Sequence, residues 1–388
     1  MKTKIQFLLT GLSIFLFVFA VSGENQKAKW KGTISEEKGV KVIKNPKTPL
    51  YGELKLDLTE DLSIGKETDD RYMFSGIRDI KVDRDENIYV LEPRNKRVQK
   101  FDQNGQFLCQ IGKQGPGPGE FQMPFSVILD DKNGIVGVQD LRTLKIFGKD
   151  GNYLNKDISL EIYSSQLVAD TNGNLWGVGR ESEGSGEAGG NTFRVLMKYN
   201  PQGKVEKKVA KVLYDIFEKR MGGAVASVVT VTLGEEYDLH ACPASDGNLI
   251  YGYSKEYELD VINPDGNPLL KIRKEEPYQN FTAEEKREAG KARLPEHKPF
   301  FYSIFSDSQG RIYTRKNHPD PAENVERIFD IFSKDGYYLY KATCLFHPYL
   351  IKNGFFYTQF VNDDTGEVFV KRFRIKNWDQ IKAGAEIK

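Results

Sequence analysis

The chain has 388 residues, of which 39% are hydrophobic and 29% charged, so it can build a large packed core and is not broadly disordered. A formal net charge of +1 argues against binding to nucleic acid or to an anionic membrane through the overall charge of the protein. The three cysteines, Cys109, Cys242 and Cys344, are too few for a disulfide framework. We expect small buried hydrophobic side chains there, with one disulfide and a leftover thiol as the alternative.

The N-terminus has the features of an export signal. Lys2 and Lys4 precede an apolar run over residues 5–21, and small residues follow up to a cleavage position near Ser22. We therefore expect residues 1–22 to be a cleaved signal peptide and the protein to be periplasmic or extracellular. An uncleaved N-terminal anchor is the alternative, although the run is shorter than the roughly 20 apolar residues of a spanning helix. After cleavage no membrane span is expected.

A first kind of turn recurs five times along the chain. Each copy has an aromatic residue or Ile, then two or three polar residues, then Gly, which supplies a positive φ at low cost. Each copy therefore predicts a β-hairpin. The copies cover residues 101–105, 147–151, 199–203, 262–266 and 332–336.

A second kind of turn precedes a β-rich run and occurs six times, alternating with the first. Two hairpin turns in each unit imply four antiparallel strands, and six such units predict a six-bladed β-propeller, because a radial arrangement protects the sheet edges. The six copies cover residues 83–86, 131–134, 170–173, 245–247, 307–310 and 353–354.

The ring needs a closing strand, because the sixth unit ends after its third predicted strand, residues 368–375. An alternating run near Leu54 to Ile64 ends in Ser-Ile-Gly-Lys, similar to the end of the first unit at residues 110–113. We expect this N-terminal strand to complete the last blade. The division is then a signal peptide, a lead-in over residues 23–49 and one propeller over residues 50–388.

The first unit resembles an NHL repeat. Its matching pieces are residues 80–83, residues 87–90, Asn95-Lys-Arg97 and, most specifically, the linker Gly115-Pro-Gly-Pro-Gly-Glu-Phe121. The match covers about residues 76–151 and weakens later. The chain thus resembles bacterial six-bladed propeller proteins related to NHL repeats. This resemblance implies the fold, but the members have diverse roles, so it does not supply a function.

Length variation falls between the turns, at residues that should lie on one face of the ring. Both repeating turns lie at one rim of a blade, so the opposite face carries the insertions, near residues 180–192, 211–236 and 274–299. The capping box at Thr282–Glu285 predicts a helix from Ala283 to about Arg293. Apolar residues at helical spacing over residues 212–221 predict a second short helix.

No cofactor is expected. The four histidines do not form a zinc motif, and the Gly-Pro linker lacks the Gly-Lys-Ser/Thr of a phosphate-binding loop. Calcium at the oxygen-rich residues 362–366, and zinc near the central opening, are the open alternatives.

We expect an exported, non-catalytic binding or scaffold propeller, a monomeric ring that presents its elaborated loop face to a protein, peptide or glycan and not to nucleic acid. The alternative is a metal-assisted lyase or lactonase-type enzyme with its site at the central opening, so catalysis is left open. Polar side chains expected near the loop face are the candidates for ligand contact, because an arginine fork binds carboxylates and carbonyls specifically. They are Arg94, Arg142, Arg180, His240, Arg315 and His318.

Overall fold

The computed structural model describes residues 30–387, except 66–67, 184–190, 215–236, 290–293 and 317–325. The expected signal peptide, residues 1–22, lies outside the described residues. Within them, no helix is long and apolar enough to cross a membrane.

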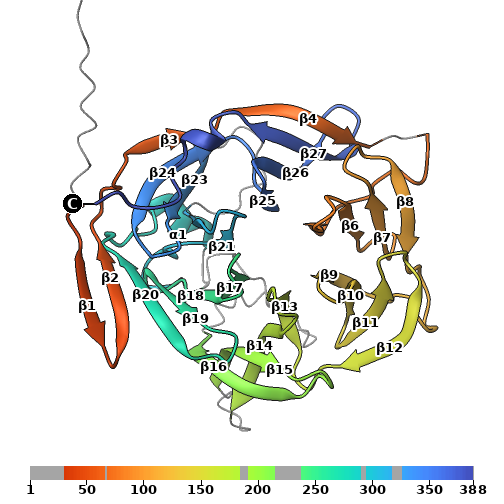
Figure 1. Ribbon diagram of the computed structural model, residues 1–388, viewed down its shortest axis with the longest axis horizontal. Coiled ribbons are helices and arrows are strands. Elements are labelled where there is room, and N and C mark those ends of the chain that lie inside the picture. Colours follow the sequence, from red (N-terminus) through yellow and green to blue (C-terminus); the bar gives the residue numbers. More distant parts are fainter. Residues whose placement is uncertain are drawn as a thin grey trace, which may run out of the picture.

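Six sheets stand radially around a common axis, each built on four antiparallel strands, which follow one another in sequence from the centre outward in the first five blades (Figure 1). This confirms the six-bladed propeller. The first blade consists of β5 (Asp79–Val82), β6 (Ile88–Glu92), β7 (Arg97–Phe101) and β8 (Phe107–Ile111). The second consists of β9 (Pro124–Asp130), β10 (Ile135–Asp140), β11 (Thr143–Gly148) and β12 (Tyr153–Ser159). The third consists of β13 (Ser164–Ala169), β14 (Leu175–Glu183), β15 (Asn191–Tyr199) and β16 (Val205–Leu213).

The last three blades also use strands from the N-terminal region. The fourth consists of β17 (Leu239–Pro243), β18 (Leu249–Tyr253), β19 (Glu258–Ile262) and β20 (Pro268–Lys274). The fifth consists of β21 (Ser303–Ser306), β22 (Ile312–Arg315), β23 (Arg327–Phe332) and β24 (Tyr338–Cys344). The sixth consists of β25 (Leu350–Lys352), β26 (Phe355–Val361), β27 (Val368–Ile375) and the N-terminal β4 (Leu58–Ile64). A short 3-10 helix, Trp378–Gln380, follows.

The ring is closed by β4, which pairs antiparallel with β27, as the sequence predicted. The predicted closing strand was too long, however, because Leu54 lies in β3 (Glu53–Lys55), which pairs parallel with β24 of the fifth blade. The chain changes blade at Leu56, whose side chain is buried between them. Closure therefore ties the N-terminal region to two blades.

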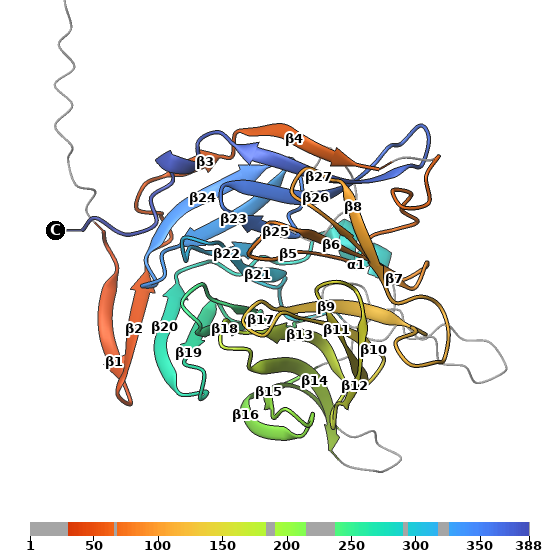
Figure 2. The same cartoon turned by 45° about the vertical axis from the view of Figure 1, so that its right-hand side comes forward.

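The described part of the expected lead-in also forms sheet. β1 (Thr33–Glu37) and β2 (Val40–Asn45) form a hairpin, and β2 pairs parallel with β20. Figure 2 shows this hairpin at the outer edge of the ring, beside β20. The fourth blade thereby becomes a six-stranded sheet, and β1 takes over its outer edge.

The second kind of turn joins the first strand to the second in all six blades, and the first kind joins the third to the fourth in the first five, which places both at one rim as expected. In three blades an aspartate directly follows the first strand, and its carboxylate accepts hydrogen bonds that stabilise the turn. Its Oδ1 accepts backbone N–H groups two and four residues on, and its Oδ2 accepts the polar hydrogen of a buried aromatic side chain six residues on. The pairs are Asp83 with Tyr89, Asp170 with Trp176 and Asp307 with Tyr313.

The linker between the first two blades is held by its own contacts. Gly115 N–H donates to Phe121 O at 3.1 Å, and Gly117 N–H donates to the Glu120 carboxylate at 3.0 Å. Phe121 is fully buried against Phe147 of the second blade. The linker thus fixes the position of one blade on the next.

The predicted helix is present as α1 (Ala283–Ala289), and its capping box is formed. Thr282 N–H donates to Glu285 Oε2 at 2.7 Å, and Glu285 N–H donates to Thr282 Oγ1 at 3.2 Å. The second predicted helix is wrong at its start, because Val212 and Leu213 belong to β16, where side chains alternate between the two faces of the sheet. Residues 216–221 lie outside the described part.

Candidate functional site

The three exposed arginines that the sequence singled out do not converge on one site. Arg94 donates to Ser75 O at 3.3 Å, and Arg142 donates to the carbonyl oxygens of Leu160 and Glu161. Each of these two side chains holds the connection that enters or follows its own blade.

Arg180 has a similar role in the third blade. Its Nη2 donates to the hydroxyl of Tyr214 at 3.1 Å, and its guanidinium lies 4.7 Å from the centre of that ring. The three exposed arginines thus bridge neighbouring segments of the chain.

Arg315 and His347 meet on the loop face near the sixth blade. Arg315 Nη1 donates to a ring nitrogen of His347, with Nη1–Nε2 2.8 Å. Burial, together with the charge of Arg327, lowers the pKa of Arg315 to about 10. Burial and the same two arginines lower the pKa of His347, so the ring stays neutral and can accept this hydrogen bond. His347 was not singled out from the sequence.

His240 lies on the innermost strand of the fourth blade, as expected, and its ring packs 5.8 Å from that of Phe301. Burial lowers the pKa of His240, Asp238 opposes this shift, and Arg315 and Arg194 add to it. Arg194 is itself buried and bonds Asp238, with Nη2–Oδ2 2.8 Å. The charge of Arg315 therefore acts on His240, while His318 lies outside the described residues.

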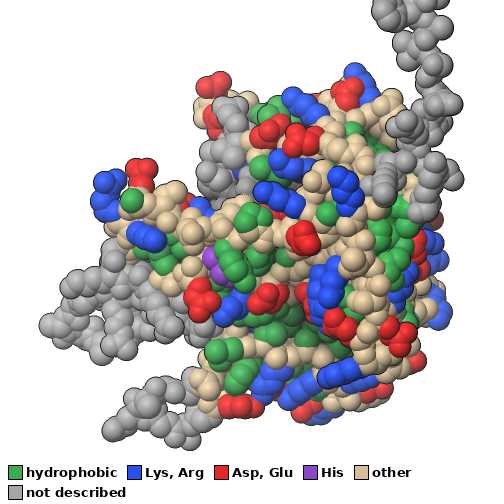
Figure 3. All heavy atoms as spheres, turned by 90° about the vertical axis from the view of Figure 1, so that its left-hand side faces the viewer, with side chains coloured by type: hydrophobic (Ala, Val, Ile, Leu, Met, Phe, Trp, Pro, Cys, Tyr) green, Lys and Arg blue, Asp and Glu red, His purple; other side chains and the backbone are tan. Residues whose placement is uncertain are grey.

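A hollow lies over the fourth blade. We call it the blade-four groove; its volume is about 730 Å³, and its walls come from β16, β18, β19, β20 and the segment after β20. Figure 3 shows the side of the molecule that carries β1, β2 and β20, where acidic and basic side chains interleave around hydrophobic patches. The insertion expected near residues 274–299 contributes Glu275, Glu276 and Tyr278 to the groove.

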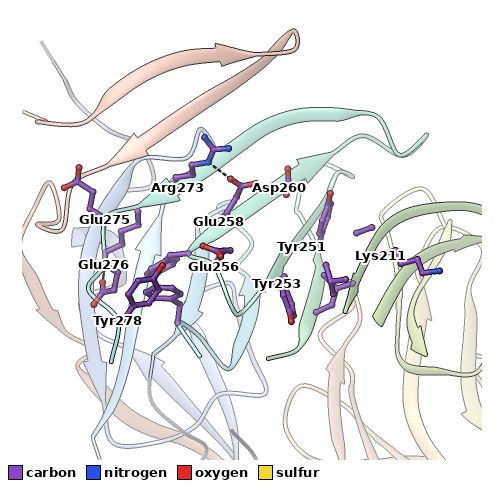
Figure 4. A pocket seen from close by; sticks show the side chains of 16 residues that line it. Lys211, Tyr251, Tyr253, Glu256, Glu258, Asp260, Arg273, Glu275, Glu276 and Tyr278 are labelled. Atoms are coloured by element: carbon purple, nitrogen blue, oxygen red, sulfur yellow. Dashed lines mark hydrogen bonds and ion pairs between the residues drawn. The ribbon is translucent and has the colours of Figure 1, made fainter. Parts of the chain in front are cut away.

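Tyrosine rings line both ends of the blade-four groove (Figure 4). Tyr251 and Tyr253 are two residues apart on β18, so both project from the same face of the sheet. The Tyr253 hydroxyl donates to Leu213 O at 2.8 Å, which fixes this ring against the third blade. Tyr278, at the other end, is 61% exposed. In the sequence, Tyr-Gly-Tyr at residues 251–253 follows the turn at residues 245–247. This alternation was the signal that could have identified the pair.

Between the tyrosines, Glu258, Asp260 and Arg273 are held in ion pairs. Glu258 accepts from Arg273, and Lys271 contacts both Glu258 and Asp260 at 2.6 Å. Burial raises the pKa of Glu258, but the hydrogen bonds from Lys271 and Arg273 outweigh it and lower the pKa overall. For Asp260 burial is the larger effect and raises its pKa. Arg273 is also bound by Glu37 of β1, so the N-terminal hairpin buttresses the groove.

No metal site is formed by the described side chains: none of them makes a group of three or more His, Cys, Asp or Glu residues that could hold an ion. In residues 362–366, where calcium is the open alternative, Asn362 Oδ1 accepts backbone N–H groups of Asp364 and Thr365, at 2.9 and 3.2 Å. No disulfide joins the cysteines, and Cys242 and Cys344 are buried, while Cys109 is half-buried.

The fold and these loop-face features define the chain as a six-bladed β-propeller. Residues 36–191 match the DUF5128 family, described as a 6-bladed beta-propeller. No curated protein sequence matches the chain. The NHL-repeat character inferred from the first unit stays a resemblance.

Solved structures share the architecture at low sequence identity. A Bacteroides fragilis NCTC 9343 protein, provisionally described as exported, is 11% identical with a TM-score of 0.52, covering 86% of this chain and 99% of its own. A DUF4221 family member from Bacteroides vulgatus ATCC 8482 is 11% identical with a TM-score of 0.50, covering 83% and 98%. A streptogramin B lyase is 10% identical with a TM-score of 0.41, covering 83% and 98%. At these identities the likeness concerns the fold alone.

Proposed function

We propose that this protein is an exported binding propeller that holds a glycan in the blade-four groove. The observation that carries the proposal is the pair Tyr251 and Tyr253 on one face of β18, beside the carboxylates of Glu258 and Asp260. Aromatic rings offer flat apolar surfaces for the C–H faces of sugar rings, and carboxylates accept hydrogen bonds from hydroxyl groups. A concave site with apolar walls and a few fixed polar groups is the usual form of a small-ligand site.

The charge arrangement favours a neutral ligand over a strongly charged peptide. Glu258, Asp260 and Arg273 are already neutralised by ion pairs. A paired carboxylate keeps lone pairs for hydroxyl donors, so it can still bind a sugar while offering little net charge. These paired groups are therefore better suited to hydroxyl groups than to the side chains of a basic peptide.

Export is supported by the N-terminal apolar run after Lys2 and Lys4. The similar fold of a Bacteroides protein provisionally described as exported agrees with it. We therefore place the ligand outside the cytoplasm, in the periplasm or beyond. Mass spectrometry of protein purified from the cell envelope tests this part: a mature chain that starts near Ser22 supports it, and an intact Met1 contradicts it.

Calorimetric titration with a panel of neutral xylo-, manno- and cello-oligosaccharides tests the glycan. We expect saturable binding to at least one of them, and a loss of more than about tenfold in affinity for Tyr251→Ala or Tyr253→Ala, from removing roughly 1–3 kcal/mol of ring contact. Tyr253→Phe keeps the ring and loses only the hydroxyl, so it is the matched control and should bind within a few-fold of the parent chain.

The proposal fails if no oligosaccharide binds. It fails equally if both alanine variants bind as tightly as the parent, because the tyrosine pair would then not be the contact surface.

A further inference from the structure

A second cavity, of about 530 Å³, lies between the fourth and fifth blades, next to the blade-four groove, with which it shares Lys274 and Glu276. This volume suits a small molecule. The charged side chains that line it are Lys47, Glu53, Lys274, Glu276, Lys298, Lys316, Asp330 and Lys341.

Two lysines share one buried carboxylate at the wall of this cavity. Lys274 Nζ lies 3.1 Å from Asp330 Oδ2, and Lys316 Nζ lies 4.0 Å from the same atom. Asp330 also accepts the hydroxyls of Tyr338 and Tyr257. Its capacity as an acceptor is therefore largely used by Lys274 and the two tyrosines, so Lys316 is the weaker partner.

Burial of the Lys316 side chain disfavours its charge, whereas two aromatic ring faces and two carboxylates favour it. Its side chain is 9% exposed, and Nζ lies 4.3 Å from the centre of the Tyr257 ring and 5.8 Å from that of Phe300. Its nearest described carboxylate oxygen is Glu276 Oε2, at 3.6 Å. Burial lowers the pKa of Lys316 and the Lys274 cation adds to the shift, while Asp330 and Glu276 oppose it; the net result is a pKa of about 8. A buried lysine next to a second cation is a known way to obtain a free, nucleophilic amine near neutral pH.

We propose that Lys316 is a nucleophilic amine that condenses with the carbonyl group of a small aldehyde or ketone held in this cavity. The Nζ lone pair attacks the carbonyl carbon, and the C=O π bond opens as the oxygen takes up a proton. An N–H proton passes to Glu276, which gives a carbinolamine. Return of that proton to the hydroxyl group expels water and leaves a protonated C=N bond to Nζ. Release of its remaining N–H proton to the solvent balances the proton that the oxygen took up from the solvent, so one amine and one carbonyl yield one imine and one water.

The other lysines of the cavity differ in their partners. Lys298 contacts the Glu285 carboxylate directly, and Lys341 Nζ lies 3.1 Å from Glu53 with 43% of its side chain exposed. Both amines lie closer to a carboxylate than the Lys316 amine does. They are internal references for the reactivity of Lys316.

Reductive trapping on the intact chain tests the proposal. The protein is incubated at pH 7 with glycolaldehyde or hydroxyacetone and sodium cyanoborohydride, and adducts are located by peptide mass spectrometry. We expect Lys316 to be alkylated at least about tenfold faster than Lys341, with a labelling midpoint near pH 8 against ~10.4 for an ordinary lysine. Lys274→Met should slow labelling of Lys316 at pH 7, because the neighbouring cation is gone, whereas Lys341→Arg should leave it unchanged.

Labelling of Lys316 at the rate of Lys341 and Lys298, with the same pH midpoint, would overturn the proposal. This comparison is made within the unmodified protein, so it does not depend on any variant folding. The proposal is also independent of glycan binding, since Tyr253→Ala should leave the labelling of Lys316 intact.

Discussion

Arg372 of β27 and Asp61 of β4 form an ion pair across the seam that closes the ring, with Nε–Oδ2 2.6 Å. Arg372 Nη1 also donates to Gln103 O at 2.9 Å, in the outer turn of the first blade. One side chain thus joins the closing strand, the last blade and the first blade. Both partners are partly exposed, so the backbone pairing of β4 and β27 carries most of the closure.

Deleting residues 50–65 should open the ring, because it removes β3 and β4 and leaves the edge of β27 unpaired. We expect large species in size-exclusion chromatography and a thermal midpoint lower by at least about 5 °C. Asp61→Asn is the control, since it removes only the ion pair and should cost less than ~1 kcal/mol. A monomeric deletion variant with the parental midpoint would refute closure by this segment.

The turn aspartate of the fifth blade should be among the most sensitive positions of the fold. Asp307 is 3% exposed, and its loss would strand the buried Arg311 guanidinium and the Tyr313 hydroxyl. We expect Asp307→Ala to lower the free energy of unfolding by about 3–5 kcal/mol in urea titrations. Asp335→Ala, at an exposed turn position, should change it by less than about 0.5 kcal/mol. A loss under ~1 kcal/mol for Asp307→Ala would contradict the role assigned to it.

Substitutions near the central opening should show whether the oligosaccharide binds there or in the blade-four groove. Arg315→Gln breaks the bond to His347 at a buried position and should cost about 1–3 kcal/mol of stability. It should leave the oligosaccharide affinity within about twofold, as should His240→Gln, because neither residue lines the groove. Loss of binding in folded variants of both would move the site to the central opening.

The pH dependence of stability should report the environment of Lys316. Its pKa is lowered to about 8 in the folded state from ~10.4 in the unfolded state, so the unfolded state binds more protons between these values. Lys316 therefore contributes stability that is fully present above about pH 10.4 and is lost as the pH falls through 8. Urea unfolding at several pH values should show the parent gaining roughly 3 kcal/mol relative to Lys316→Met between pH 8 and 10.4. Parallel curves for the two proteins would show that the amine titrates normally.

The sequence by itself determined the number of blades, the order of their strands and the side of the ring that carries the insertions. These follow from local chemistry: Gly105 and Gly336 take positive φ at the turns, and Thr282 and Glu285 cap their own helix. Short-range rules of this kind can be applied to neighbouring residues without knowing what packs above them.

Only the tertiary structure decided which side chains meet. The parallel pairing of β2 with β20 joins segments more than two hundred residues apart and brings Glu37 to Arg273 at the groove. Different strands and loops supply Lys274, Lys316 and Asp330. The structure also showed that Arg94 and Arg142 bind the segments that connect their own blades to the rest of the ring. Such contacts depend on how the blades stack around the axis. The residues that bury Lys316 and shift its pKa are distant from it in the sequence, and no sequence pattern predicts that they meet it.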